Sequence, residues 1–238
     1  MSEDAIAMNA AAENLIQKNL GTFGTILADP PWRFTNRTGK VAPEHKRLSR
    51  YNTMSFKEIG DLPIAEMALP KSHLYLWVPN ALVQEGLEVM KCWGFQYKTN
   101  LVWYKVRKDN GPDRRGVGFY FRNVTEMVLF GVRGHIRTLP PGRSMPNIIV
   151  AMKREHSRKP DDLYEIIEKC SPGPYLELFA RHPHEGWSQW GDEIDGKAPT
   201  PESKQVAAIV VPQPDELFAI REKHTRYRKS RVAALDTA

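Results

Sequence analysis

Short apolar runs alternate with stretches of helical periodicity along most of this chain. The apolar runs have the length and content of buried strands, and they cover residues 26–28, 73–78, 101–106, 126–132, 147–150, 174–180 and 187–190. Between them, apolar residues three and four positions apart predict helices over 81–93 and 163–170. This alternation predicts an α/β sheet that is covered by helices on both faces.

Capping residues mark where the predicted helices begin and end. Gly94 closes the helix over 81–93, whose apolar positions are Leu82, Leu87, Val89 and Met90. Pro160 suits the first turn of the helix over 163–170, whose apolar face is formed by Leu163, Ile166, Ile167 and Cys170. Ser55 and Glu58 have the spacing of a capping box, which predicts a further short helix from Phe56.

The composition is that of an ordinary globular protein of one domain. The 238 residues are enough for a sizeable core. Neither a run of eighteen apolar residues nor a basic segment followed by an apolar one is present, so we expect no membrane span and no secretory signal. Cys92 and Cys170 fit buried small hydrophobes in a reducing compartment, the cytoplasm, and give no metal-binding pattern. The net charge of +6 and the pI of about 9.3 suit a polyanionic partner.

The first apolar run leads directly into Asp29, Pro30, Pro31 and Trp32. The prolines end the strand because they cannot donate to a sheet ladder. Asp29 is thereby held at the carboxyl end of a strand, where open α/β sheets bind their ligands. Its carboxylate and the Pro30 carbonyl could accept the two N–H groups of a flat base, on which the Trp32 ring would stack. Two such acceptors favour a tetrahedral amino nitrogen whose lone pair can attack a methyl group. For the four residues alone, a rigid turn is the alternative interpretation.

Four further segments occur together with this motif. They are Tyr51-Asn52-Thr53-Met54, Leu74-Tyr75-Leu76-Trp77-Val78, His156-Ser157-Arg158-Lys159-Pro160-Asp161 and Leu176-Glu177-Leu178-Phe179-Ala180-Arg181. In this order they resemble the MT-A70 family of S-adenosylmethionine-dependent adenine-N(6) methyltransferases, over about residues 24–196. The resemblance implies a Rossmann-like methyltransferase fold with a mostly parallel mixed sheet, S-adenosylmethionine as cofactor and no metal. The chain lacks the Gly-x-Gly-x-x-Gly fingerprint, so spacing alone would not have indicated a nucleoside cofactor.

The resemblance also implies roles for individual residues. Asp29 and the Pro30 carbonyl would hold the amino group, and Trp32, together with Tyr51, would stack on the base. The implied cofactor contacts are Asp29, Lys159, Glu177, Arg181, His182 or His184, Asp192 and Glu193. Which of the two histidines corresponds to the histidine of the family is open, because this segment is one residue out of step with the family pattern. Some relatives carry amides in place of Asp192 and Glu193, so these two contacts are the weaker ones. Glu177 also stands inside an apolar strand, where an unpaired charge is costly, so a cofactor contact or an ion pair with Arg181 is expected.

Two basic segments, 33–50 and 107–118, are predicted to form loops beside the cleft. Flexible basic loops are what a phosphate backbone would meet. The expected substrate contacts are Arg37, Lys46, Arg47, Arg50, Tyr51, Trp77, Lys105, Arg114 and Arg115. The alternatives are a solvated surface loop for the first segment, a mobile hairpin tip for the second and a core position for Trp77.

The domain organisation follows from the same patterns. Residues 1–20 form a short amphipathic helix or a loose arm, residues 21–196 the methyltransferase domain, and residues 197–238 a Pro-containing linker and a basic tail. If residues 221–231 of the tail form a helix, basic side chains lie on nearly all of its sides. This suits an accessory nucleic-acid contact, and the alternative is a charged, frayed end.

The function expected from these features is transfer of a methyl group from S-adenosylmethionine to adenine in nucleic acid. DNA is favoured over RNA, because a compact catalytic domain with its own basic tail is similar to bacterial and phage members of the family. An RNA adenine methyltransferase and a catalytically silent nucleic-acid-binding subunit are the alternatives, and the intact Asp29–Trp32 motif argues against the latter. A methyltransferase for a small molecule or protein would not need the basic loops. A homo- or heterodimer is compatible with the family, and no membrane partner is expected.

Overall fold

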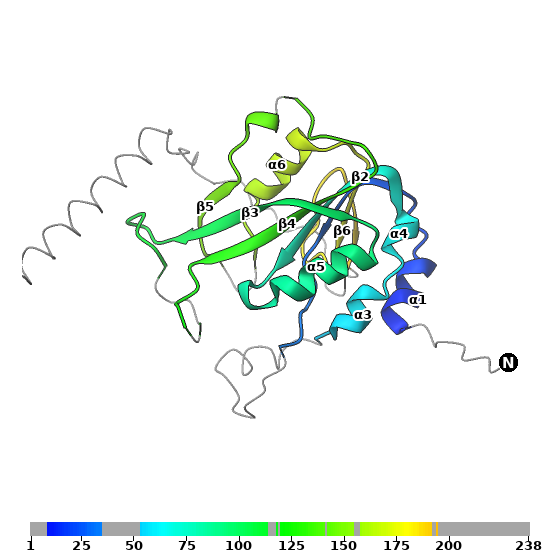
Figure 1. The fold of residues 1–238 in the computed structure, drawn as a ribbon, viewed down its shortest axis with the longest axis horizontal. Coiled ribbons are helices and arrows are strands. Elements are labelled where there is room, and N and C mark those ends of the chain that lie inside the picture. Colours follow the sequence, from blue (N-terminus) through cyan, green and yellow to red (C-terminus); the bar gives the residue numbers. More distant parts are fainter. Residues whose placement is uncertain are drawn as a thin grey trace, which may run out of the picture. The chain divides into compact units, whose positions relative to one another are not determined.

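A seven-stranded sheet forms the centre of the computed structural model (Figure 1). The structure describes residues 9–34, 53–113, 118, 120–140, 142–154, 158–191 and 194. The strand order is β5-β3-β4-β2-β1-β6-β7. The strands are β1 (Phe23–Ala28), β2 (Ala68–Val78), β3 (Gln96–Val106), β4 (Thr125–Arg133), β5 (Ile148–Met152), β6 (Tyr175–Leu178) and β7 (Trp187–Trp190).

One strand of the seven, β4, runs against the others. It pairs antiparallel with both β2 and β3, whereas the remaining neighbours pair in parallel. The chain passes from β1 to β2 on one side and returns much later, through β6, to the other side of β1. Such a reversal of strand order opens a crevice at the carboxyl ends of the strands, and Asp29 stands at that edge. The predicted α/β fold with a mostly parallel mixed sheet is therefore confirmed.

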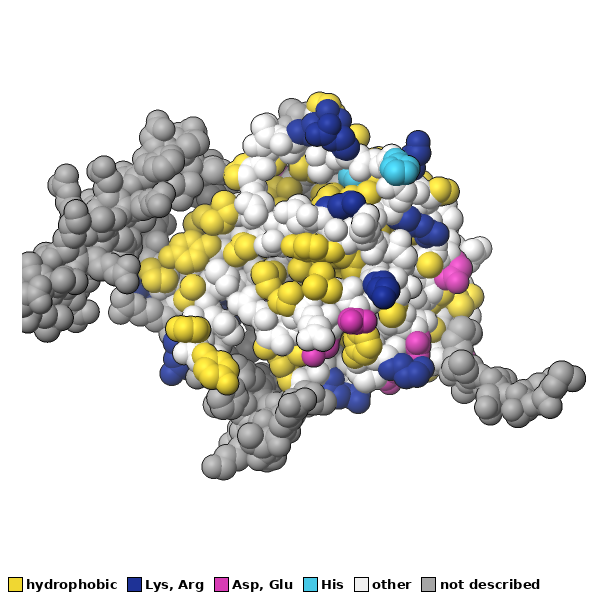
Figure 2. Space-filling model, in the orientation of Figure 1, with side chains coloured by type: hydrophobic (Ala, Val, Ile, Leu, Met, Phe, Trp, Pro, Cys, Tyr) yellow, Lys and Arg dark blue, Asp and Glu magenta, His cyan; other side chains and the backbone are white. Residues whose placement is uncertain are grey.

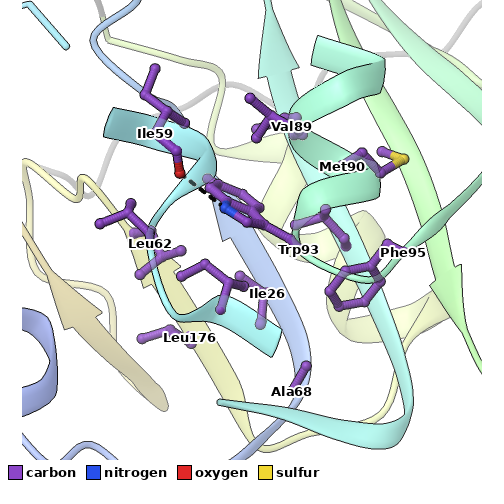
Figure 3. Packing of buried hydrophobic residues seen from close by; sticks show 14 of the residues in the cluster. Ile26, Ile59, Leu62, Ala68, Val89, Met90, Trp93, Phe95 and Leu176 are labelled. Atoms are coloured by element: carbon purple, nitrogen blue, oxygen red, sulfur yellow. Dashed lines mark hydrogen bonds between the residues drawn. The ribbon is translucent and has the colours of Figure 1, made fainter. Parts of the chain in front are cut away.

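Four helices cover one face of the sheet: α1 (Ala10–Gln17), α3 (Phe56–Gly60), α4 (Ile64–Met67) and α5 (Val83–Cys92). The short 3-10 helix η1 (Asn80–Leu82) leads into α5. Trp93 lies at the centre of this core, fully buried, and its indole N–H donates to the Ile59 carbonyl at 3.0 Å (Figure 3). Helix α1 is fastened to the other end of the sheet, because the Trp190 indole N–H donates to Asn14 Oδ1 at 2.8 Å.

The opposite face is covered by α6 (Asp162–Cys170), and the 3-10 helix η2 (Gly142–Ser144) lies beside its end. Leu163, Ile166, Ile167 and Cys170 of α6 are buried, as their spacing predicts. They join a core whose sheet side chains come from every second position, including Leu27, Tyr75, Trp77 and Trp103. Helices on both faces agree with the sequence pattern, because a fully covered parallel sheet needs apolar side chains on both of its sides.

The buried face of α5 differs from the predicted one. Gly86, Val89 and Met90 are buried, whereas Leu87 is 38% exposed. The reason is the close approach of the helix to the sheet, since a Cβ on Gly86 would lie 2.6 Å from a Val78 methyl carbon. Cys92, at the end of this helix, is exposed. The prediction that both cysteines are buried was therefore wrong for Cys92 and is confirmed for Cys170. Among the described residues, no helix combines the length and the apolar content needed to span a bilayer.

Candidate active site

The alternation of side chains along the strands determines which residues point to the α6 side of the sheet at its carboxyl edge. Leu27 of β1, Trp77 of β2, Trp103 of β3 and Val128 of β4 all face the core beneath α6. Residues two positions further toward this edge point the same way, because strand side chains have a period of two. The strand pattern therefore places three charged residues on that side: Asp29 after β1, Lys105 near the end of β3 and Glu126 near the start of β4.

The turn that carries Asp29 is held by backbone hydrogen bonds. Asp29 N–H donates to the Leu178 carbonyl of β6 at 3.4 Å, and Trp32 N–H donates to the Pro30 carbonyl at 2.8 Å. The Pro31 carbonyl accepts from Met54 N–H at 2.9 Å, so the segment before α3 is paired with the motif. The Pro30 carbonyl keeps a second lone pair for a further donor.

Trp32 lies in the core on the other face of the sheet. Its side chain is 6% exposed, and its indole N–H donates to the Trp77 carbonyl at 3.0 Å. The stacking of Trp32 on a base stays a prediction, because in this structure the ring is packed and bonded in the core. The physical reason is the turn itself, which sends Asp29 to one side of the sheet and Trp32 to the other.

Four charged side chains form an alternating chain across the strand ends. Lys159 Nζ lies 2.6 Å from Asp29 Oδ2 and 3.7 Å from Glu126 Oε2. Glu126 forms a second ion pair with Lys105. Lys159 Nζ lies 5.2 Å from the centre of the Trp77 ring, and Lys105 Nζ lies 4.9 Å from that of Trp103. The two indoles thus form an apolar floor beneath two ammonium groups, a geometry that favours cations.

This arrangement keeps the middle of the chain charged. Burial alone would lower the pKa of Lys159, but the carboxylates of Asp29 and Glu126 outweigh burial and raise that pKa. Burial would likewise raise the pKa of Glu126, but the charges of Lys159 and Lys105 lower it. At neutral pH the site therefore contains fixed opposite charges at the end of β1, where a polar ligand would meet them.

Glu177 forms a second polar group beside the chain. Its two oxygens accept hydrogen bonds from the Tyr164 hydroxyl at 2.9 Å and from Gln189 Nε2 at 2.6 Å. Burial, opposed by these hydrogen bonds, raises the pKa of Glu177 to about 7, and the charge of Asp29 adds to the rise. The carboxyl group is thus poised to change its charge near neutral pH, and a ligand that donates to it would favour the ionised form.

Of the two candidate histidines, His184 belongs to this polar group. Its ring stacks on Tyr164 at 4.0 Å between centroids, and its backbone N–H donates to Gln189 Oε1 at 2.9 Å. Its Nε2 lies 3.4 Å from Glu168 Oε1. His182 is exposed and contributes its carbonyl, which accepts from Gln189 Nε2 at 2.8 Å.

The chain between β6 and β7 is strained where it borders the site. Phe179 has φ of 63°, which bulky side chains rarely adopt, and its ring packs edge-on against Trp190. Ala180 N–H donates to the Trp190 carbonyl at 2.9 Å. Gly191 follows, and a Cβ there would lie 2.3 Å from the Ala180 carbonyl oxygen. Strain of this kind is found at functional sites, where packing elsewhere holds it.

The structure brings together part of the set of residues that the sequence predicts. Asp29, Lys159, Glu177 and His184 lie in the two polar groups, and Arg181 lies close enough for its charge to act on Lys159. Trp77 and Lys105 also belong to the site, where they are buried at 2% and 8% exposure, and their contact with the substrate stays a prediction. The remaining predicted contacts lie outside the described residues: Arg37, Lys46, Arg47, Arg50, Tyr51, Arg114, Arg115, Asp192 and Glu193.

Three residues of the site were not predicted: Glu126, Tyr164 and Gln189. Glu126 carries the same signal as Glu177, a carboxylate next to an apolar strand run, and could have been found by the same argument. Tyr164 and Gln189 give no comparable signal, since both are ordinary in their helix and strand. No group of three or more His, Cys, Asp or Glu side chains in the described part of the chain is arranged to hold a metal ion.

Comparison with known proteins agrees with the sequence motifs. Residues 23–193 match the sequence model of the MT-A70 family. A putative N(6)-adenosine-methyltransferase MT-A70-like protein of Medicago truncatula is 32% identical over 79% of this chain. The human N(6)-adenosine-methyltransferase catalytic subunit METTL3 is 32% identical over 74% of it. The match covers 29% of the length of each of these two relatives. The type II methyltransferase M.MunI of a Mycoplasma species is 27% identical, and there the match covers 77% of this chain and 83% of that enzyme.

Proposed function

The chain belongs to the MT-A70 family, and on this premise we propose that it transfers a methyl group from S-adenosylmethionine to the exocyclic amino group of adenine in nucleic acid, with DNA favoured over RNA. The observation that carries the proposal is the position of Asp29. Its carboxylate stands at the carboxyl end of β1, at the reversal of strand order, and is held by Lys159 at 2.6 Å.

Asp29 and the Pro30 carbonyl are the two acceptors for the amino group of adenine. When they accept its hydrogens, the nitrogen lone pair is less delocalised into the ring and can attack a methyl carbon. S-adenosylmethionine, when bound, supplies that electrophilic methyl group. Attack by the nitrogen would form the new N–C bond and break the C–S bond, whose electron pair stays on sulfur. The Asp29 carboxylate, which already accepts a hydrogen of the amino group, would take the proton that the methylated nitrogen loses and pass it to water.

Lys159 makes Asp29 available at the right moment. In the present arrangement it occupies one oxygen of Asp29, and Glu126 offers a second carboxylate only 3.7 Å away. A small movement of the Lys159 side chain would bring its ammonium group closer to Glu126 and free Asp29 for the substrate. Lys159 would then be paired with Glu126, and Asp29 with the amino group of the substrate. Glu126 and Lys105 act in this proposal as positioning residues.

The residues present suit the cofactor. S-adenosylmethionine carries a carboxylate, an ammonium group and ribose hydroxyls, and the site offers a cation in Lys159 and hydrogen-bond acceptors in Glu177. The rise in the pKa of Glu177 to about 7 fits a carboxyl group that is fully ionised only when a donor of the cofactor joins those of Tyr164 and Gln189. Arg181 and His184 border the same group and are the further contacts that we propose, together with Asp192 and Glu193 beyond the described residues.

Two observations support a nucleic-acid substrate. The match to M.MunI extends over 83% of that enzyme, which favours a similar role as a modifying enzyme of DNA. The basic segment 33–50, which follows the Asp29–Trp32 motif directly, offers the charges that phosphates require. In duplex DNA the adenine must leave the base stack, at a cost of a few kcal/mol that such phosphate contacts offset.

The test is nucleoside mass spectrometry after the full chain and S-adenosylmethionine are incubated with DNA and RNA of mixed sequence. Asp29→Asn removes the charge of the acceptor, and Asp61→Asn, in an exposed ion pair with Lys57, is the matched control. We expect N(6)-methyladenine from DNA with the wild type and the control, and none with Asp29→Asn. Binding of cofactor without methylation of either polymer would contradict the proposed activity. Methylation of RNA alone would reverse the choice of substrate, and full turnover by Asp29→Asn would exclude the role of Asp29.

A further inference from the structure

Two adjacent aromatic side chains stand out from the connection between β3 and β4. Tyr120 is 94% exposed and Phe121 is 85% exposed, more than any other large hydrophobic side chain among the described residues. Figure 2 shows hydrophobic side chains projecting beside basic ones at the lower left, where this connection lies in Figure 1. Exposing two neighbouring rings is unfavourable in water, so a surface of this kind indicates a binding partner.

The connection starts and ends at the candidate active site. Lys105 and Glu126, which form an ion pair in the site, stand next to the two ends of the connection. Lys105 also fixes its base, since its N–H donates to the Val124 carbonyl at 2.8 Å and its carbonyl accepts from Asp113 N–H at 2.8 Å. Phe121 precedes Glu126 by five residues, which limits its distance from the site to about 17 Å even for a fully extended chain. The aromatic pair can therefore reach the neighbours of a base that occupies the site.

The charges around the pair are suited to phosphate. Segment 107–124 contains five Lys or Arg and two Asp. Both acids are engaged within the structure, since Asp109 forms an ion pair with Arg107 and Asp113 is 2% exposed. Lys108 and Arg122 are exposed, so the charge that this part of the loop presents to solvent is positive. Positive side chains next to exposed rings are the combination by which proteins bind stacked bases and their backbone.

We propose that Tyr120 and Phe121 stack on the bases next to the target adenine and, in a duplex, occupy the space that the adenine leaves. This inference rests on the proposed function and names the way in which the substrate is opened and held. Apolar side chains that enter a base step unstack it at a cost of a few kcal/mol. The positive side chains of the loop offset that cost through the phosphates. A protein partner could also pack against the two rings, but binding of a protein would not explain why positive side chains stand beside them.

The experiment compares the double variant Tyr120→Ala/Phe121→Ala with two controls. Tyr120→Phe/Phe121→Tyr keeps both rings, and Tyr97→Ala removes a ring that is 42% exposed at the other end of β3. Each protein is measured for binding to a labelled mixed-sequence DNA, as duplex and as single strand, for methylation of both forms, and for permanganate reactivity of duplex thymines, which reports unstacked bases. The three residues that are changed, Tyr97, Tyr120 and Phe121, are all exposed at least in part, so circular dichroism should show an unchanged fold.

We expect the double alanine variant to bind both forms of DNA about tenfold more weakly, as loss of base stacking implies. Duplex methylation should fall by about the same factor, single-strand methylation by less, and the permanganate signal should disappear, whereas both controls resemble the wild type. Unchanged DNA binding by the double alanine variant would refute the inference. A change in oligomeric mass without a change in DNA binding would instead assign the rings to a protein interface. If the wild type binds DNA but methylates nothing, the proposed function fails while the binding and permanganate measurements still decide the role of the rings.

Discussion

Replacing Lys159 by Met tests whether the charged chain of the site is as strongly coupled as its geometry indicates. Met keeps the length of the side chain and removes the ammonium group. At an effective dielectric constant of 20, Coulomb's law gives about 6 kcal/mol for the contact with Asp29 at 2.6 Å and about 4 kcal/mol for that with Glu126 at 3.7 Å. Desolvation of the three groups offsets most of this gross attraction. Removing one partner of a fully buried ion pair costs about 3–5 kcal/mol.

The net loss in Lys159→Met should lie below that range. The Asp29 side chain is 24% exposed, so water can hydrate part of the charge that is left without a partner. Glu126 keeps its ion pair with Lys105. We therefore expect the free energy of unfolding to fall by about 2–3 kcal/mol. Lys57→Met is the matched control, because Lys57 Nζ also lies 2.6 Å from a carboxylate oxygen, that of Asp61, but the two side chains are 74% and 47% exposed. For that exposed pair the expected loss is below about 0.5 kcal/mol.

The assay is urea denaturation of the three proteins at pH 8 and pH 3.5, without ligands. The pKa of Glu126 is lowered in the folded protein and that of Lys159 is raised. The stability that the Glu126 carboxylate contributes is present above its ordinary pKa, about 4.3, and is lost as the pH falls through the lower, folded value. The difference between wild type and Lys159→Met should therefore shrink at the lower pH. Equal losses in the two Met variants at pH 8, or a difference that is unchanged at pH 3.5, would refute this account.

Three further results follow from the same structure. Because the pKa of Glu177 is raised to about 7, wild-type affinity for S-adenosylhomocysteine should increase from pH 6 to pH 8, and calorimetry with Glu177→Gln should give a flat profile. Burial lowers the pKa of His73 from 6.5 to about 4, so the unfolded chain binds the additional proton and unfolding free energy should fall by up to about 3 kcal/mol between pH 6.5 and pH 4. Urea titrations of His73→Gln should show a much smaller slope over that range. Gly191→Ala should lower both the melting temperature and cofactor affinity, because its Cβ would meet a carbonyl oxygen at 2.3 Å, whereas Gly60→Ala, with its nearest contact at 3.6 Å, should change neither in scanning fluorimetry.

Local sequence signals predicted local structure well. The capping box is an example: Ser55 N–H donates to Glu58 Oε2 at 2.6 Å, and the Ser55 hydroxyl accepts from Glu58 N–H at 3.3 Å, as the spacing indicated. All the groups involved lie within four residues, so no distant part of the chain was needed for the inference. Helix α6 is similar, because its apolar face was fixed by the sequence spacing alone.

Strand ends were predicted poorly for the opposite reason. Strand β2 begins at Ala68, five residues before the apolar run, and includes Pro70 and the exposed Lys71. Its first part is held by pairing with distant strands, since Ala68 lies opposite Phe23 of β1 and Ser72 opposite Arg133 of β4. Pairing of this kind overrides local composition, and it cannot be inferred before the strand order is known.

The strand order also decides how the site is composed. Lys105, Glu126 and Asp29 come from β3, β4 and the end of β1, and the sequence places them far apart. The period of two along each strand could have assigned them to one face, but only the order β3-β4-β2-β1 brings the two acids to either side of Lys159. The individual residue types were visible in the sequence, whereas the alternation of their charges in space was not.

Trp77 shows how the two faces of the sheet cooperate in this site. Its carbonyl accepts the indole N–H of Trp32 on one face, and its ring lies under the ammonium group of Lys159 on the other. Asp29 stands between these two contacts: its own turn is anchored by Trp32, and its carboxylate is held by Lys159. The aromatic residue of the motif thus anchors the turn of Asp29 through a hydrogen bond to the backbone of Trp77. A carboxylate that is anchored from one face and paired with a cation on the other is fixed in position, and the second acid beside Lys159, Glu126, gives that cation a partner if a substrate displaces it from Asp29.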